Sequence, residues 1–188
     1  MRIGDHMDRV LEEIALTLVD LTDREPELLL DMMQRAEKIF CAGSGRSGLV
    51  MRTFAMRLMH MSLQSFVAGE TTTPGIGKRD LLIIGSGSGE TEGLLVMAQR
   101  ARQVGAQVAL VTVLPESHIG KLADLTVVIP ATTAKVKKGT RPRVQSVQPR
   151  GSLFEQCMFI FLESLLLRHM ERTGFKPDDI MIRHANLE

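Results

Sequence analysis

The sequence has little that would mark a disulfide-bonded or metal-binding protein. It lacks tryptophan and tyrosine, and its only two cysteines are Cys41 and Cys157. Both cysteines stand in apolar surroundings outside any CxxC or Cys/His cluster, and the five histidines are not spaced like metal ligands. We therefore expect two buried thiols in a reducing compartment, with no disulfide and no metal.

Long apolar runs and an excess of charge are also missing. No run of about 18 apolar residues occurs that could span a membrane. Residues 1–10 are charged and lack the apolar core of a signal peptide. The formal net charge of +1 predicts no general binding to nucleic acid or to membranes. These absences predict a cytoplasmic protein, and 188 residues suit one domain that covers the chain.

What the sequence does contain is an alternation of short apolar runs with stretches of helical periodicity. This predicts the α/β class: a three-layer, Rossmann-like fold with a five-stranded parallel sheet flanked by helices. The runs 81–84 and 108–111 lack polar alternation, as expected of strands buried on both faces. The predicted strands are 38–42, 64–68, 80–85, 106–113 and 125–129, and the predicted helices are 7–22, 25–37, 47–61, 90–104, 116–123 and 153–172.

The segment 131–151 is predicted to be a long polar loop, and loops of this length are often functional. It carries no acidic residue, and it lacks the interleaved aromatics of single-strand nucleic-acid binders, so we expect it to be solvated or to steer phosphate. The next helix is apolar at consecutive positions 157–162, which predicts burial on all sides against partner subunits. The basic residues of the loop are Lys135, Lys137, Lys138, Arg141, Arg143 and Arg150.

Two glycine-rich turns, 43–48 (GSGRSG) and 85–91 (GSGSGET), each follow a predicted strand and precede a predicted helix. Glycine lets the backbone approach a ligand closely, and the N-terminus of the helix attracts an anion. Both turns should lie at the carboxyl ends of parallel strands, where ligands bind. Tight turns with Ser and Thr as simple helix caps are the alternative. Three hydroxyls interleaved with three glycines exceed what a cap needs, so the second turn is predicted to bind phosphate.

The first turn also fits a dinucleotide-binding module, a function of a different class. Gly43, Gly45 and Gly48 match G-x-G-x-x-G, and Glu70 follows the second strand where such a fold keeps its ribose-binding acid. A dinucleotide site has no need for the second hydroxyl-rich turn, however, and the chain has no room for a separate substrate domain.

Two residues near the ends of the last long helix are candidates for chemistry. Ser152 and Glu155 fit a capping box, S-x-x-E, and a carboxylate here could equally serve as a general base that moves a proton between adjacent sugar carbons. The two roles can coexist. His184 would ordinarily be an idle exposed histidine, but we hypothesise that it reaches an active site, either that of its own chain or that of a neighbouring subunit.

These motifs resemble those of a known group. The two turns, GSGRSG at 43–48 and SGSGET at 86–91, resemble the sugar isomerase (SIS) domain. Within that group, the segments 148–156 (QPRGSLFEQ) and 184–188 (HANLE) are similar to those of the 6-phospho-3-hexuloisomerase family. The resemblance covers essentially the whole chain, and the two C-terminal motifs are its most specific part. One departure is Arg150, where the family commonly has methionine.

The resemblance implies an isomerase that converts D-arabino-3-hexulose 6-phosphate to fructose 6-phosphate in the ribulose monophosphate pathway of formaldehyde fixation. It also implies a homotetramer that needs no cofactor and works after a 3-hexulose-6-phosphate synthase. In the family pattern Glu155 is the proton acceptor. The substrate-binding residues that it implies are Ser47, Ser86, Gly87, Ser88, Gly89, Glu90 and Thr91.

The chemistry of the implied substrate fits the residues that are present. In a 3-ketose 6-phosphate no free hydroxyl can close a five- or six-membered ring on C3, so the substrate is an open chain. It needs a phosphate-binding turn, one base and donors for the enediolate oxygens, for which backbone amides or His184 are available. A non-catalytic phosphosugar sensor is the remaining alternative. Such regulators usually carry a DNA-binding module, and no basic recognition helix precedes the first predicted strand.

Overall fold

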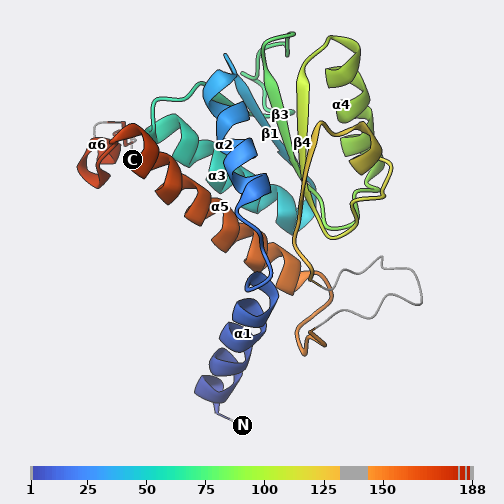
Figure 1. Cartoon of the computed structure of the whole chain (residues 1–188), viewed down its shortest axis with the longest axis vertical. Helices are drawn as coiled ribbons and strands as arrows, with labels where there is room; N and C mark the ends of the chain where they lie inside the picture. The colour runs from blue at the N-terminus through green and yellow to red at the C-terminus, as the bar shows by residue number, and fades with distance from the viewer. Residues whose placement is uncertain (1, 132–143, 182, 185, 187–188) are drawn as a thin grey trace.

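A computed structural model describes residues 2–131, 144–181, 183, 184 and 186 of the chain (Figure 1). Most of the basic loop, 132–143, lies outside the described residues, and with it the predicted roles of its lysines. The helices of the described residues are α1 (Ile3–Leu18), α2 (Arg24–Arg35), α3 (Gly45–His60), α4 (Glu92–Gln103), the 3-10 turn η1 (Gly120–Leu122), α5 (Ser152–Thr173) and α6 (Pro177–Met181). None of them is long and apolar enough to cross a bilayer.

A five-stranded sheet, parallel throughout, forms the centre of the molecule, which confirms the predicted α/β class. Its strand order is β2-β1-β3-β4-β5, and the register pairs Gly43 with Gly85 at the ends of the two central strands. All strand ends therefore point the same way, and the two glycine turns lie side by side. The strands are β1 (Ile39–Gly43), β2 (Ser65–Val67), β3 (Leu81–Gly85), β4 (Gln107–Thr112) and β5 (Leu125–Val128).

Helices cover both faces of the sheet, so the three-layer prediction is also confirmed (Figure 1). Alternate strand residues point to opposite faces. Ile39 and Cys41 join one apolar core with α2, α3 and α5. Phe40 and Ala42 join a second core with α4 and η1. The sheet is thus buried on both sides, as its uninterrupted apolar strands predict.

Both cysteines are buried and free, as predicted. Burial raises the pKa of both thiols, to about 11 for Cys157, where a hydrogen bond with Thr17 opposes the effect in part. Both thiols are therefore protonated at neutral pH and inert, and they serve as small apolar side chains of the core.

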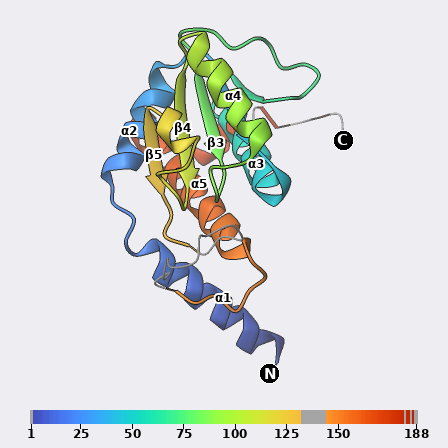
Figure 2. The ribbon, with the colours of Figure 1, turned by 90° about the vertical axis from the view of Figure 1, so that its right-hand side faces the viewer.

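The first helix, α1, extends away from the body of the molecule, as two perpendicular views show (Figures 1 and 2). It starts at Ile3, four residues before the predicted start, because the Asp5 carboxylate accepts a hydrogen bond from the Arg2 backbone N–H at 2.8 Å and closes the first turn. Ile3, Met7 and Leu11 follow one another at helical spacing and are 78%, 58% and 62% exposed. This stripe is apolar surface that the single chain leaves uncovered.

One predicted helix is wrong. The segment 116–123 forms only the short turn η1, because the chain folds back tightly there. An added Cβ at Gly120 would lie 1.9 Å from the Pro115 carbonyl oxygen, and the Ile119 N–H bonds to the Gly89 carbonyl at 3.2 Å instead of continuing a helix. The segment is therefore tied to the second glycine turn. The short helix α6 in the tail was not predicted.

The first glycine turn requires its glycines for close backbone packing. An added Cβ at Gly43 would lie 2.9 Å from both Cα and N of Gly48, and one at Gly48 would lie 2.8 Å from the Gly43 carbonyl oxygen. These neighbours are backbone atoms that cannot rotate aside. The G-x-G-x-x-G spacing of this turn thus reflects the packing of β1 against α3.

We expect Gly43→Ala to lower the free energy of unfolding by about 1–3 kcal/mol, because the new methyl group overlaps the α3 backbone. Gly93→Ala is the matched control, since nothing lies within 4 Å of an added Cβ there and alanine favours the helix. Urea unfolding followed by circular dichroism measures both. Equal stabilities of the two variants would contradict this account.

Candidate active site

The site is a pocket of about 180 Å³ at the carboxyl ends of β1 and β3. Three helices begin at its edge: α3 at Gly45, α4 at Glu92 and α5 at Ser152. The first turn of a helix leaves backbone N–H groups unpaired and carries the positive end of the helix dipole. Three such ends around one small cavity make it a site for an anion.

The second glycine turn supplies most of the hydrogen-bond donors in this pocket. Gly87, Ser88 and Thr91 line it, and their backbone N–H groups bond to nothing in the described part of the chain. The Ser86 hydroxyl accepts a hydrogen bond from Gly89 N at 3.1 Å, and that of Ser88 accepts one from Glu90 N at 3.3 Å. Both hydroxyls therefore keep a proton to donate. Amides and hydroxyls gathered in this way form a nest that suits a phosphate group.

The hydroxyls of the two turns do not act as simple helix caps. Thr91 and Ser44 occupy the N-cap positions of α4 and α3, yet neither side chain bonds to its own helix. Ser47, on the first turn of α3, lines the pocket beside Ser44. The interpretation of these turns as capped loops is therefore wrong, and the hydroxyls are available to a ligand.

Gly89 and Glu90 shape the second turn but do not line the pocket. Gly89 has φ +59°, and an added Cβ would lie 2.0 Å from Ser117 Oγ, so only glycine fits there. The Glu90 carboxylate points to His118: one oxygen accepts from the His118 backbone N–H at 3.1 Å and the other lies 2.5 Å from Nδ1. These contacts hold the turn against the loop before η1.

Glu155, on the first turn of α5, brings a carboxylate into the same pocket. Its side chain is only 15% exposed, and it accepts a hydrogen bond from Nε of Arg46, a residue of the first glycine turn. The predicted capping box is wrong. Gly151, with φ +96°, occupies the N-cap position, so Ser152 is already the first helical residue and no side chain caps α5. Glu155 is thereby free to face Arg46.

The first turn of α5 can reach the glycine turns because they carry no side chains there. An added Cβ at Gly87 would lie 3.0 Å from the Phe154 ring, and one at Gly85 would lie 2.7 Å from the sulfur atoms of Met51 and Met158. Phe154 also lines the pocket and gives it an apolar wall. These close contacts set the distance between the carboxylate and the phosphate-binding turn.

The segment that leads into α5 is fastened by Glu13 of α1, a residue that the sequence analysis missed. Glu13 is only 6% exposed. Its carboxylate accepts hydrogen bonds from Ser146 Oγ at 2.6 Å, Val147 N at 2.9 Å and Gln148 Nε2 at 3.0 Å. The only sequence signal was its position between Val10 and Thr17 on the inward face of α1.

His184 lies away from the pocket of its own chain. Its ring stacks on His60, with centroids 5.6 Å apart and planes at 22°. His60 ends α3, whereas the pocket lies at the beginning of that helix. The 16 residues of α3 span about 24 Å. The structure therefore brings Glu155, Ser47 and the second turn together but leaves His184 apart.

No three His, Cys, Asp or Glu side chains of the described residues gather in a way that could hold a metal ion. Glu70, the acid of the dinucleotide alternative, forms an ion pair with Arg52 and is not among the residues that line the pocket. The pocket as a whole offers hydrogen-bond donors for a phosphate and one carboxylate. This combination suits acid–base chemistry on a phosphorylated sugar.

Comparison with known proteins assigns the chain to a class. The model of the SIS domain matches residues 32–148, so the chain belongs to the SIS-domain family. The 3-hexulose-6-phosphate isomerase of Bacillus subtilis is 39% identical over 188 residues and 100% of both chains. That of Mycobacterium gastri is 40% identical over 186 residues, which cover 99% of this chain and 92% of the relative.

A solved structure agrees with these relatives. A protein from Methanococcus jannaschii, whose structure infers a molecular function of 3-hexulose-6-phosphate isomerase, is 34% identical with a TM-score of 0.84, over 98% of this chain and 99% of that one. Within the SIS-domain family, the chain therefore belongs with the 3-hexulose-6-phosphate isomerases. This name and 6-phospho-3-hexuloisomerase denote one activity, so the resemblance found in the sequence is confirmed.

The link between Glu13 and the segment 146–148 gives a prediction about pH. Burial by itself would raise the pKa of Glu13, but the hydrogen bonds from Ser146, Val147 and Gln148, with the charge of Arg9, together hold it below the ordinary 4.5. A carboxyl whose pKa is lowered by folding stabilises the folded state above its unfolded pKa, and this contribution is lost as the pH falls through the folded value.

We therefore expect Glu13→Gln to lower the free energy of unfolding by about 1–3 kcal/mol at neutral pH, because glutamine offers only one acceptor oxygen to three donors. The difference from wild type should shrink as the pH falls below about 4.5, where the wild-type carboxyl itself becomes protonated. Urea unfolding at a series of pH values measures it. A difference that does not change with pH would show that the charge of Glu13 is irrelevant.

Proposed function

We propose that this protein isomerises D-arabino-3-hexulose 6-phosphate to D-fructose 6-phosphate. The observation that carries the proposal is the single carboxylate, Glu155, placed in a pocket otherwise built to hold an anion. The full-length identity of 39% to the Bacillus subtilis isomerase supports the same substrate. A non-catalytic sensor would have no need of a carboxylate beside the substrate carbons, and a dinucleotide site would have no need of the second turn.

The residues suggest how the reaction proceeds. The turn 86–91 and the N-terminus of α4 hold the phosphate on C6. Glu155 takes the proton from C2, which gives an enediolate over C2 and C3, and returns it to C3. The carbonyl oxygen on C3 gains a proton as the hydroxyl on C2 loses one, so the carbonyl moves from C3 to C2. Ser44, Ser47 and the amides of α3 are available donors for the oxygen that becomes negative.

Arg46 acts in this scheme as a positioning residue. Its guanidinium bonds to Glu155 and so fixes the direction in which the carboxylate faces the substrate carbons. Arg46 belongs to the first glycine turn, whose backbone is locked by the contact of Gly43 with Gly48. The base is therefore held by two elements, α5 and the first turn.

The test of the proposal is an assay in which a synthase makes the 3-hexulose 6-phosphate from formaldehyde and ribulose 5-phosphate, with fructose 6-phosphate as the measured product. Glu155→Gln should reduce kcat by about 10²–10⁴-fold, because it removes the base, and should leave product binding intact. Glu163→Gln on the same helix is the matched control and should keep full activity. No fructose 6-phosphate from folded wild-type protein would refute the proposal.

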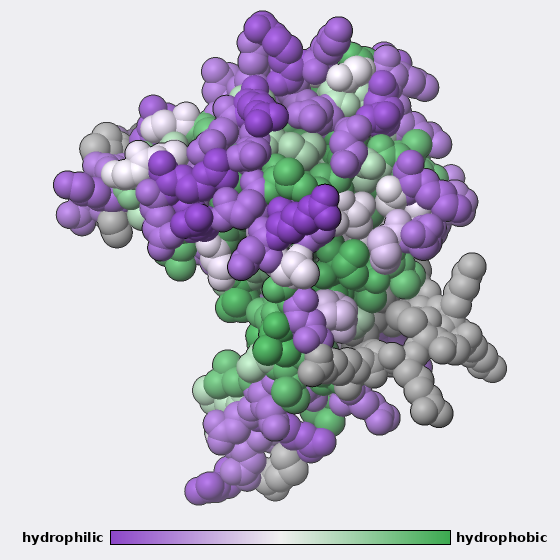
Figure 3. All heavy atoms as spheres, in the orientation of Figure 1, coloured by the Kyte–Doolittle hydropathy of each residue, from purple (hydrophilic) through white to green (hydrophobic). Residues whose placement is uncertain are grey.

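We also propose that the protein works as a homotetramer. Apolar surface lies directly beside the site: Leu49, Phe159 and Ile160 are 63%, 38% and 43% exposed and share a pocket of about 400 Å³ with Arg46 and Glu155. A larger groove of about 680 Å³ lies between α5 and the residues that join α1 to α2, and Arg168 is one of its lining residues. Apolar atoms are visible where α1 leaves the body (Figure 3). Subunit contacts would cover this surface.

In such an assembly, His184 would serve the pocket of a neighbouring subunit, because it stacks on His60 at the end of α3, whereas its own pocket lies at the beginning of that helix. We expect His184→Ala and Glu155→Gln each to be nearly inactive alone. Mixed and reassembled, they should regain about a quarter of wild-type activity, since one site in four receives both intact residues. A mixture as inactive as its parts would place both residues in one subunit's site, and full activity of His184→Ala would remove His184 from the mechanism.

The chemistry of the substrate indicates which reaction must precede this one. A 3-hexulose 6-phosphate arises from aldol addition of formaldehyde to ribulose 5-phosphate, so we propose that the protein follows a 3-hexulose-6-phosphate synthase in the ribulose monophosphate pathway. The two buried thiols fit a reducing compartment, and we propose the cytoplasm.

A further inference from the structure

Arg150 is a charged residue of the pocket that the scheme above does not use. It immediately precedes Gly151 and lines the same cavity as Ser86, Ser88 and Thr91. Within the described part of the chain, its guanidinium forms no hydrogen bond or ion pair. The other cation beside the pocket, Arg46, is occupied by Glu155. Among the described residues, Arg150 is therefore the positive charge beside the pocket that is available to a ligand.

The packing of α5 indicates which part of the ligand Arg150 meets. Phe154 and Met158 lie one turn apart on the helix and contact Gly87 and Gly85, on the side of the second glycine turn. Glu155 faces the other way, toward Arg46 on the first turn. Arg150 immediately precedes Gly151, the N-cap residue of α5, and lines the pocket together with Ser86 and Ser88 of the second turn. Arg150 therefore borders the cavity that contains the phosphate nest.

We propose that Arg150 binds the phosphate of the substrate and closes the nest from the side of α5. The inference rests on the proposed function, in which the second turn holds this phosphate. The turn itself offers only neutral amides and hydroxyls, whereas a phosphate monoester carries close to two negative charges at neutral pH. A guanidinium adds a full positive charge and two parallel N–H donors that match the phosphate oxygens.

The kinetics distinguish this role from contact with the reacting oxygens. The phosphate is equally charged in the bound substrate and in the transition state, so a residue that binds it lowers KM and leaves kcat nearly unchanged. A residue that stabilises the enediolate acts in the transition state alone, and its loss lowers kcat. The product also carries the phosphate, so its affinity reports the contact without any turnover.

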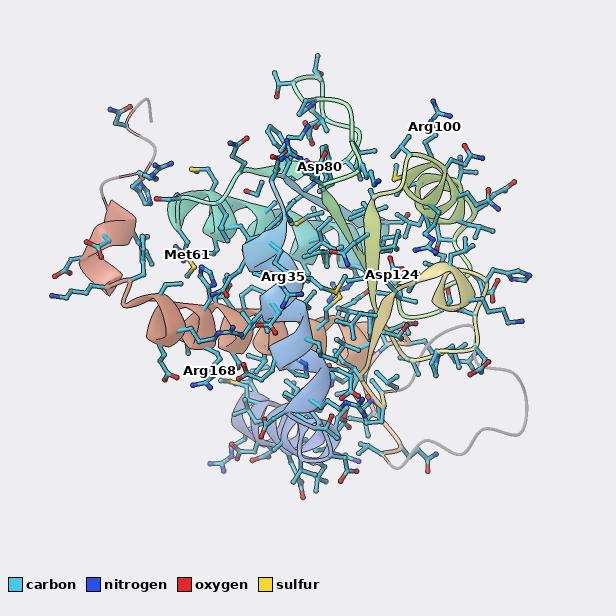
Figure 4. The ribbon with its side chains drawn as sticks, turned by 45° about the horizontal axis from the view of Figure 1, so that its top comes forward. Arg35, Met61, Asp80, Arg100, Asp124 and Arg168 are labelled. Carbon is cyan, nitrogen blue, oxygen red and sulfur yellow. The ribbon has the colours of Figure 1, made fainter. Side chains whose placement is uncertain are left out.

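The experiment compares Arg150→Met and Arg150→Lys with Arg100→Met. Arg100 lies on the last turn of α4 and points outward (Figure 4), so its loss removes the same charge away from the pocket. We expect Arg150→Met to raise KM and the dissociation constant of fructose 6-phosphate, measured by calorimetry, about 10- to 100-fold. Its kcat should stay within about twofold of wild type. Arg150→Lys should recover part of the affinity, and Arg100→Met should match wild type.

Unchanged KM and unchanged product affinity in Arg150→Met would overturn the inference, and so would a loss of kcat with affinity retained. If Arg150→Met does not fold, Arg150→Lys decides, because a point charge without the planar fork should still weaken binding measurably. Wild-type protein that binds fructose 6-phosphate but does not turn over would refute the isomerase and leave Arg150 testable by calorimetry. Failure to bind both fructose 6-phosphate and inorganic phosphate would refute both proposals.

Discussion

The site depends on how closely the first turn of α5 can approach the ends of β1 and β3. Side chains at Gly85 and Gly87 would collide with Met158 and Phe154, so the glycines allow the helix to come within contact of the sheet edge. That approach places Glu155 beside Arg46 and narrows the pocket to about 180 Å³. It also adds a third helix N-terminus to the two that follow the strands. A parallel sheet aligns all its strand ends, so the helices that follow the strands begin at the same edge. Their N-termini carry partial positive charge and favour an anion there.

The sequence was sufficient for the parts of the molecule that depend on local pattern. Strands buried on both faces show as unbroken apolar runs, and the glycine turns between strands and helices show as spaced glycines, so the sheet and the pocket edge were predictable. The helix at 116–123 failed because nothing local reveals that Ile119 bonds to Gly89, and the capping box failed because Gly151 adopts a left-handed conformation that shifts the start of α5. The periodicity of a segment cannot reveal partners outside it.

The residues that the sequence analysis missed are joined across long stretches of chain. Arg46 and Glu155 are separated by 109 positions, and Glu13 and Ser146 by 133. Each is ordinary in its own neighbourhood: an arginine between small residues, and a glutamate on an amphipathic helix that carries other acidic residues. Their roles arise only when the fold brings a distant donor or acceptor to them. Arg150 differs in that it was noticed in the sequence, as a departure from the methionine that the family commonly has, but only the structure shows which pocket it lines.

The hydrogen bonds between Glu13 and residues 146–148 connect two properties of the molecule, the association of its subunits and the geometry of its active site. The helix that carries Glu13 also presents the apolar stripe of Ile3, Met7 and Leu11. In an assembly that forms through this stripe, neighbouring subunits would hold α1 in place. Through Glu13, α1 would in turn hold the segment 146–148 that leads into α5. Association and catalytic geometry would then be thermodynamically linked. Dissociation of the subunits on dilution would also make the position of Glu155 less well defined. The quaternary structure would act on the chemistry without any subunit needing to change its fold.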